Sequence, residues 1–259
     1  METMSEFKSR SILITGAGGG LGRALVDAFA DRGARVIGCD LSLGEMDGLP
    51  LDARHAFDLS DHAAIEAATQ VMIEKDGLPD VVVNNAGWTR AETMDALTAA
   101  TIGTEIDLNL TGVAIFANAL LKPMLARGSG NFVFISSVNA LSHLGNPAYA
   151  AAKAGINAIA RAIAVEYGRR GIRSNVVCPG SIRTPAWDHR LAKDAEILGK
   201  LQRLYPLGRI VEAREVAEAV AFLASDRASG ITGTVLPVDA GLTAGSLPFI
   251  DDILGGNSA

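Results

Sequence analysis

Short apolar runs alternate with longer helical patterns along most of the chain. The apolar runs have the length and composition of buried strands and cover residues 11–15, 34–40, 55–57, 80–83, 132–135, 172–178 and 234–238. Between them, the sequence reads as helix over residues 23–31, 60–75, 105–126, 147–167 and 212–223. Alternating strands and helices are typical of a parallel sheet with helices on both faces. The pattern therefore predicts an α/β fold, with a single Rossmann-like, doubly wound domain around a parallel sheet of about seven strands.

The two ends of the chain differ in composition from this central region. Residues 1–10 are mostly polar and are expected to form a flexible N-terminal segment before the domain, which spans residues 11–241. Residues 242–259 form a C-terminal tail whose apolar side chains include Phe249 and Ile253. We expect this tail to pack on the same domain or at the interface of an oligomer.

Composition narrows the functional classes. With 49% hydrophobic residues over 259 positions, the chain can bury a sizeable core. A net charge of −6 without a basic run argues against nucleic acid as a partner. No uninterrupted apolar run approaches the roughly 18 residues of a membrane span, and no secretory signal precedes the first strand. Cys39 and Cys178 fall in apolar runs without metal-site spacing, which predicts buried thiols, a cytoplasmic location and no metal.

The first strand leads into a glycine-rich turn and then a helix. Five of the seven residues 16–22 are glycine, and Gly16, Gly20 and Gly22 fit the pattern G-x-x-x-G-x-G. Glycines let a backbone turn tightly and approach a pyrophosphate, which binds the N–H groups at the start of the helix. A plain tight turn would not need so many glycines, so the stretch predicts a dinucleotide site.

An acidic residue, Asp40, ends the second strand. A carboxylate at this position accepts hydrogen bonds from the adenosine ribose and repels a 2′-phosphate, which favours NAD over NADP. Arg23, just after the glycine turn, is the nearby cation that would favour the phosphate instead. Further along, Asp58 follows the third strand, where its carboxylate would cap the next helix or accept from the adenine amino group.

The stretch from 132 to 153 carries the candidate chemistry. An apolar strand ends at Ser136 and Ser137, and a helical pattern then places Tyr149 and Lys153 four residues apart on one face. An ammonium beside a phenol is expected to lower its pKa, and such a phenol can exchange a proton with an alcohol or a carbonyl. Strand alternation puts the two serines on opposite faces, so only one can reach the same oxygen.

Two stretches with asparagine are less specific. Asn109 lies in a helical pattern beside Thr111 and Gly112, where helix propensity is locally broken. It would either hold a water linked to Lys153 or bond a neighbouring loop. The fourth strand runs into Asn-Asn-Ala-Gly at 84–87, whose amides would bond the backbone or a ribose.

Taken together and in this order, these motifs resemble the compact, 250-residue type of the short-chain dehydrogenase/reductase family. The resemblance runs from Thr15 to Gly241. It implies catalytic roles for Ser137, Tyr149, Lys153 and Asn109. It implies cofactor contacts for Gly16, Gly18, Gly20, Leu21, Gly22, Asp40, Asp58, Leu59, Asn85, Ala86, Gly87, Tyr149, Lys153, Pro179, Gly180, Ile182 and Thr184. In one respect the chain departs from many members: Ser137 lies 12 residues before Tyr149 rather than 13, the spacing that would select Ser136.

The resemblance implies an NAD-dependent enzyme that interconverts a secondary alcohol and its carbonyl, and it suggests a homotetramer. A regulatory protein that binds NAD without turnover is the alternative, although it would not need the four catalytic residues together. The substrate stays open. Polar neighbours would suit a polyol or sugar, whereas tryptophans would suit a ring; the candidate neighbours are Trp88, Arg90, Asn139, His143, Trp187 and His189.

Overall fold

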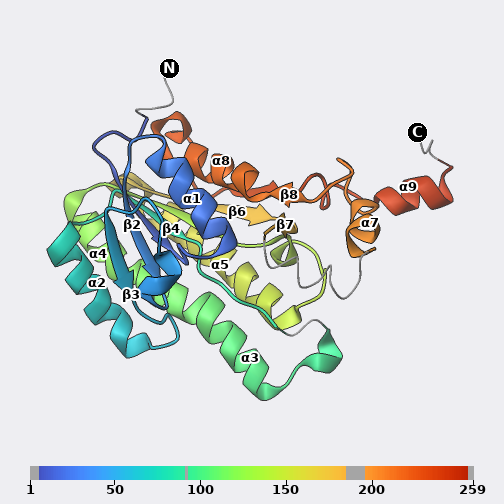
Figure 1. Cartoon of the computed structure of the whole chain (residues 1–259), viewed down its shortest axis with the longest axis horizontal. Helices are drawn as coiled ribbons and strands as arrows, with labels where there is room; N and C mark the ends of the chain where they lie inside the picture. Colours follow the sequence, from blue (N-terminus) through green and yellow to red (C-terminus); the bar gives the residue numbers. More distant parts are fainter. Residues whose placement is uncertain (1–5, 91–92, 185–195, 256–259) are drawn as a thin grey trace.

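The computed structural model describes residues 6–90, 93–184 and 196–255 (Figure 1). Its centre is a seven-stranded parallel sheet with the order β3-β2-β1-β4-β5-β6-β9, which confirms the predicted fold. The strands are β1 (Ser11–Thr15), β2 (Arg35–Asp40), β3 (Ala53–Ala56), β4 (Val81–Asn84), β5 (Gly130–Ile135), β6 (Ile172–Pro179) and β9 (Val235–Val238). A separate two-stranded pair joins β7 (Ile182–Arg183) to β8 (Val211–Glu212).

The order of the strands reverses between β1 and β4. From β1 the chain builds outward through β2 and β3, and it then returns to pair β4 with the other edge of β1. Because all these strands are parallel, their carboxyl ends meet at one edge of the sheet. In such folds the crevice at the reversal is where ligands bind, so this edge holds the candidate site.

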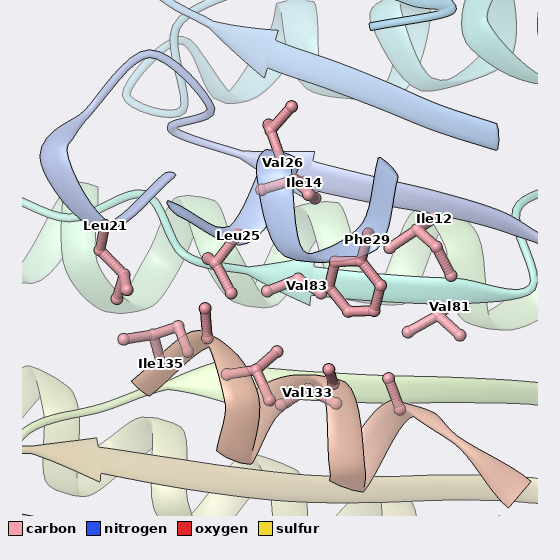
Figure 2. Packing of buried hydrophobic residues seen from close by; sticks show 14 of the residues in the cluster. Ile12, Ile14, Leu21, Leu25, Val26, Phe29, Val81, Val83, Val133 and Ile135 are labelled. Carbon is pink, nitrogen blue, oxygen red and sulfur yellow. The ribbon is translucent and has the colours of Figure 1, made fainter. Parts of the chain in front are cut away.

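Helices cover both faces of the sheet, and strand alternation decides which core each side chain joins. Ile12 and Ile14 of β1 pack with α1 and α8, whereas Leu13 packs on the opposite face with α2, α4 and α5. Figure 2 shows the first of these cores, where Phe29 and other α1 side chains meet β1, β4 and β5. The covering helices are α1 (Gly20–Ala30), α8 (Ala213–Ala224), α2 (His62–Asp76), α4 (Gly112–Arg127) and α5 (Pro147–Tyr167).

The predicted helix at 105–126 is longer than expected and is interrupted. It begins with α3 (Ala99–Ile106), passes through a π-helical turn (Asp107–Thr111) and continues as α4. Among the described helices, this stretch alone is long and apolar enough to cross a membrane by length and composition. Val113, Phe116 and Leu120 of α4 are buried in the core against the sheet, which accounts for much of its hydrophobicity.

The described part of the N-terminal segment packs against the domain. Phe7 is 1% exposed and meets Phe29 edge to face, with 5.1 Å between the ring centroids. Glu6 pairs with Arg227 at 2.8 Å and with Arg32 at 3.7 Å. The prediction of a flexible segment is therefore wrong for residues 6–10, because one buried aromatic ring anchors a stretch whose average composition is polar. Residues 1–5 lie outside the described part of the chain.

The C-terminal tail forms a short helix at the end of the molecule that is remote from the sheet. This helix, α9 (Leu247–Ile253), lies beyond α7 (Ile197–Gln202) in Figure 1. An ion pair of 3.6 Å between Arg203 and Asp252 joins the two. Half or more of the surface of Phe249 and Ile253 is exposed, so these side chains are not packed on the domain. Packing of the tail at an oligomer interface stays a prediction.

Two helical glycines predict opposite responses to alanine. A Cβ atom on Gly112 would lie 2.0 Å from the Leu59 carbonyl oxygen, whereas one on Gly103 would meet nothing within 4 Å. Gly103→Ala should raise the free energy of unfolding by about 0.5–1 kcal/mol through helix propensity. Gly112→Ala should lower it by about 1–3 kcal/mol through overpacking. Urea denaturation measures both, and stabilisation by Gly112→Ala would contradict the close approach of α4 to the 57–61 loop.

Candidate functional site

A cleft of about 510 Å³ opens at the carboxyl ends of the strands, with the glycine turn and Tyr149 both in its wall. Most of the residues predicted to contact a cofactor or to act in catalysis line it. These are Gly16, Gly20, Leu21, Gly22, Asp40, Leu59, Asn85, Ala86, Gly87, Ser137, Tyr149, Lys153, Pro179, Gly180 and Ile182. Gly18, Asp58, Asn109 and Thr184 do not line it directly. Trp187 and His189 lie outside the described residues.

The glycine turn brings backbone groups to the cleft surface. Gly16 adopts a φ of 64°, which favours glycine, and a Cβ atom on Gly22 would lie 2.0 Å from the Gly16 carbonyl oxygen. Helix α1 then begins at Gly20, and the residue before it, Gly19, supplies no side-chain acceptor for its first N–H groups. An open helix N-terminus against a side-chain-free turn fits a pyrophosphate.

Asp40 lines the cleft beside this turn, and Arg23 is bonded to the turn itself. The Asp40 carboxylate accepts hydrogen bonds from the backbone N–H groups of Gly18 and Leu41, both at 2.8 Å. Arg23 donates to the carbonyl oxygens of Gly18 at 2.8 Å and Glu45 at 2.7 Å. An anion in the cleft wall and a cation tied to the turn thus lie close together, and Arg23 is not merely solvated.

The loop after β3 corrects the assignment of a helix cap. Helix α2 begins at His62, and Asp61, not Asp58, accepts from the backbone N–H of Ala64 at 3.1 Å. Asp58 instead accepts from both the N–H and the hydroxyl of Ser60, each at 2.8 Å. Two acids in one short loop compete for the cap, and the one directly before the helix takes it. Contact of Asp58 with adenine stays a prediction.

The Asn-Asn-Ala-Gly segment is fastened to the glycine turn by side-chain hydrogen bonds. The Asn85 amide donates to the carbonyl oxygens of Thr15 and Gly16, both at 3.0 Å. In return, the Thr15 hydroxyl accepts from the N–H groups of Asn85 and Ala86 at 3.0 and 3.1 Å. The sequence predicts that this amide bonds either the backbone or a ribose, and in the structure it bonds the backbone. The reversal point between β1 and β4 is thereby fixed.

Ser136 and Ser137 have different partners, as strand alternation requires. The Ser136 hydroxyl donates to the Lys153 carbonyl oxygen at 3.0 Å and so holds the backbone of α5. The Ser137 hydroxyl donates to the side-chain oxygen of Asn139 and accepts from its backbone N–H, both at 3.2 Å. Both serines line the cleft, and the action of Ser137 beside Tyr149 stays a prediction.

Lys153 and Tyr149 are paired, but burial dominates their protonation. The Lys153 ammonium donates to the Ile135 carbonyl oxygen at 3.0 Å and lies 5.5 Å from the centroid of the Tyr149 ring. Burial lowers the pKa of Lys153 to about 8 and raises the pKa of Tyr149 to about 12. The sequence-based expectation of a lowered phenol pKa is wrong for this structure, because burial raises the pKa of Tyr149 more than the Ser137 side chain lowers it.

Asn109 lies in the π-helical turn, where the sequence indicates a break in propensity. It is fully buried, and its amide nitrogen donates to the carbonyl oxygens of Trp88 at 2.7 Å and Glu105 at 2.9 Å. Its amide oxygen accepts from the N–H of Trp88 at 3.0 Å. Asn109 therefore bonds a neighbouring loop, the second alternative left open above. A link to Lys153 through water stays a prediction.

The segment after β6 closes another side of the cleft. Pro179, Gly180 and Ile182 line the cleft, and Thr184 packs against Gly20 of the glycine turn. The phenol of the buried Tyr205 accepts from the N–H of Ser181 at 2.9 Å and so anchors this segment. The glycine turn and the 179–184 segment therefore meet across the cleft.

Of the described neighbours proposed for a substrate, Trp88 lines the cleft. Trp88 is 40% exposed, and the Arg90 guanidinium lies 5.5 Å from the centroid of its ring. Asn139 is occupied locally, because its amide donates to the Gly145 carbonyl oxygen at 2.9 Å. The sequence interpretation missed Glu105, a buried acid four residues before Asn109; this i,i+4 spacing was its available signal.

Comparison with known proteins agrees with this geometry. A family model described as "Enoyl-(Acyl carrier protein) reductase" matches residues 16–243. The chain is 40% identical over 255 residues to an uncharacterized oxidoreductase, C922.06, of Schizosaccharomyces pombe, with 97% of each chain covered. It is 36% identical over 247 residues to cis-4-hydroxycyclohexanecarboxylate dehydrogenase of Sinomonas cyclohexanicum, with 92% of this chain and 98% of the relative covered.

Solved structures give the same result. A Burkholderia thailandensis oxidoreductase of the short-chain dehydrogenase/reductase family is 38% identical, with a TM-score of 0.89, and 96% of this chain and 99% of that one are covered. A Burkholderia cenocepacia gluconate 5-dehydrogenase in complex with NADP and tartrate is 30% identical, with a TM-score of 0.86 and coverage of 94% and 98%. The chain belongs to the short-chain dehydrogenase/reductase family of oxidoreductases.

Proposed function

We propose that this oxidoreductase interconverts a secondary alcohol and its carbonyl compound with NAD as cofactor, at a site formed by Ser137, Tyr149, Lys153 and Asn109. The observation that carries the proposal is that one cleft is lined both by a bare glycine turn and by Ser137, Tyr149 and Lys153. When bound, the dinucleotide would supply the hydride donor or acceptor. The chain's own residues would bind it and handle the proton.

Tyr149 is the proton donor and acceptor in this proposal. With its pKa raised to about 12, the neutral phenol predominates near pH 7 and suits proton donation to a carbonyl oxygen. The reverse reaction requires the phenolate, which higher pH favours. Lys153, buried beside the ring with its pKa lowered to about 8, would still be charged near pH 7 and would stabilise a phenolate formed there. The Ser137 hydroxyl would hydrogen-bond the same substrate oxygen.

The choice of NAD rests on Asp40. Its carboxylate lines the cleft next to Gly18 of the glycine turn, where it would accept from ribose hydroxyls and repel a 2′-phosphate. The gluconate dehydrogenase neighbour binds NADP, so family membership alone does not decide between the two cofactors. Arg23 is the opposing charge, but in this chain its guanidinium is bonded to two backbone carbonyl groups.

We also propose a cytoplasmic homotetramer. Cys39 and Cys178 are buried free thiols, as a reducing compartment permits. Helix α5 exposes a face of small residues, and Val165 on it is 83% exposed, while α9 exposes Phe249 and Ile253. Unpaired apolar surfaces of this kind are typical of subunit interfaces.

Light scattering on the purified protein should give the mass of four chains. Val165→Lys should shift that mass downward if the exposed face of α5 is an interface, because a buried unpaired charge is costly. Glu166→Lys, an exchange at the adjacent exposed residue, is the comparison. A wild-type protein with the mass of one chain would contradict the tetramer.

Tyr149→Phe should lower kcat for alcohol oxidation by about 100- to 10,000-fold, because the general acid–base group is removed. Binding of NAD, measured by calorimetry, should persist. In the wild type, kcat/KM for oxidation should rise with pH above 7, since the raised pKa of Tyr149 leaves little phenolate at neutral pH. Full turnover in the variant would refute the assignment. Bound NAD without turnover in the wild type, across polyols, sugars, hydroxysteroids and cyclic or aryl alcohols, would favour the regulatory alternative.

Asp40→Asn should reduce the preference for NAD over NADP by about tenfold, a free-energy difference of about 1.4 kcal/mol. The exchange keeps the size and the acceptor oxygen while it removes the charge that repels a 2′-phosphate. The ratio of kcat/KM for the two cofactors is the measurement. Asp47→Asn, an exposed acid in the following loop, is the matched control. An unchanged ratio in Asp40→Asn would exclude Asp40 as the selector.

A further inference from the structure

Helix α3 contains a buried acid that the proposed reaction does not use. Glu105 has no exposed surface. A carboxylate in such a place is costly unless hydrogen bonds satisfy it. Its Oε1 atom accepts from the hydroxyl of Thr89 at 2.9 Å and from the backbone N–H of Arg90 at 2.7 Å. The carboxylate therefore binds the loop that follows β4.

Asn109, one helical turn further on, binds the same loop. Its amide accepts from the N–H of Trp88 and donates to the Trp88 carbonyl oxygen, at 3.0 and 2.7 Å. The amide also donates to the Glu105 carbonyl oxygen at 2.9 Å, which ties the two holding residues together. Two side chains of one continuous helical stretch thus hold the loop at residues 88–90. They bond the backbone of Trp88 and Arg90 and the hydroxyl of Thr89.

The held loop forms part of the cleft wall. It follows Gly87, where a Cβ atom would lie 3.0 Å from the Asn109 amide oxygen and 3.1 Å from the Lys153 ammonium nitrogen. Trp88 lines the cleft, and Arg90 lies over its ring at 5.5 Å. Trp88 therefore follows directly on a residue whose backbone lies close to the lysine beside Tyr149. A shift of the 88–90 backbone would move this aromatic wall.

We propose that Glu105 is a positioning residue for substrate: its buried carboxylate fixes Thr89 and Arg90 so that Trp88 presents a set aromatic wall to a ring-bearing secondary alcohol or ketone. The proposal rests on the proposed function and adds to it a substrate class. A ring presents a broad apolar face that gains from contact with a fixed indole, whereas an open-chain polyol gains little. Hydrogen bonds to an ionised acceptor are roughly twice as strong as neutral ones, which explains a carboxylate in this place.

The kinetic test compares Glu105→Gln with Asp107→Asn. Both remove one negative charge from the same helical stretch, but Asp107 is exposed and holds no loop residue among the described hydrogen bonds. Glu105→Gln should raise KM for cyclohexanol-type substrates about tenfold, while kcat and the Kd for NAD change less than threefold. KM for an open-chain secondary alcohol should change less than threefold. Asp107→Asn should leave all these constants unchanged.

A spectroscopic test does not depend on turnover. The chain has two tryptophans, so Trp187→Phe leaves Trp88 as the single emitter. In that background, Glu105→Gln should increase the acrylamide quenching of Trp88 by about twofold or shift its emission, and Asp107→Asn should do neither. If wild-type protein turns over no alcohol, the proposed function fails, and this comparison still decides whether Glu105 holds Trp88.

Unchanged quenching together with unchanged emission of Trp88 in folded Glu105→Gln would overturn the proposal, and so would an equal rise of KM for cyclic and open-chain substrates. If Glu105→Gln does not fold, Thr89→Val provides the second test, because it removes one partner of the carboxylate without altering the buried charge. Thr89→Val should then raise KM for cyclic substrates and Trp88 quenching in the same direction, by smaller factors. If Thr89→Val changes neither the KM for cyclic substrates nor the quenching of Trp88, the proposal is also overturned.

Discussion

The reversal of strand order between β1 and β4 is the constraint on which the rest of the structure depends. It leaves a gap at the carboxyl edge of the sheet that no crossover helix covers. The hydrogen bonds between Thr15 and Asn85 hold the two strand ends at a fixed separation. Because β5 and β6 continue the same parallel register, Ser137 and Gly180 reach the same edge. Residues that are far apart in the sequence therefore face one cleft.

Local sequence was sufficient for features that depend on spacing along one element. The alternation of strands and helices specified the sheet, and the four-residue interval between Tyr149 and Lys153 placed both in the cleft wall. The glycine turn was recognisable because its conformation depends on the residues within it. These elements are locally consistent with the global fold, which is where interpretation of a single sequence works best.

Features that depend on the surroundings of a residue were beyond such reasoning. Burial raises the pKa of the Tyr149 phenol, and neither burial nor the direction of the Lys153 ammonium follows from spacing. Phe7 packs against Phe29 of α1, which is distant in the sequence. Asp61 caps α2, although Asp58 lies in the same loop and could also act as a cap. The partners of Glu105 could not be predicted, because they lie 15 and 16 residues earlier in a loop without regular structure.

The hydrogen bonds of Arg23 join two segments that follow β1 and β2. Its guanidinium fastens the glycine turn to the loop after β2 by bridging the carbonyl groups of Gly18 and Glu45. The turn and the loop are thereby coupled, so that a displacement of either would be passed to the other. If NAD is the cofactor, as proposed, the prior engagement of this guanidinium by two intramolecular acceptors would add to the repulsion that Asp40 exerts on an additional phosphate.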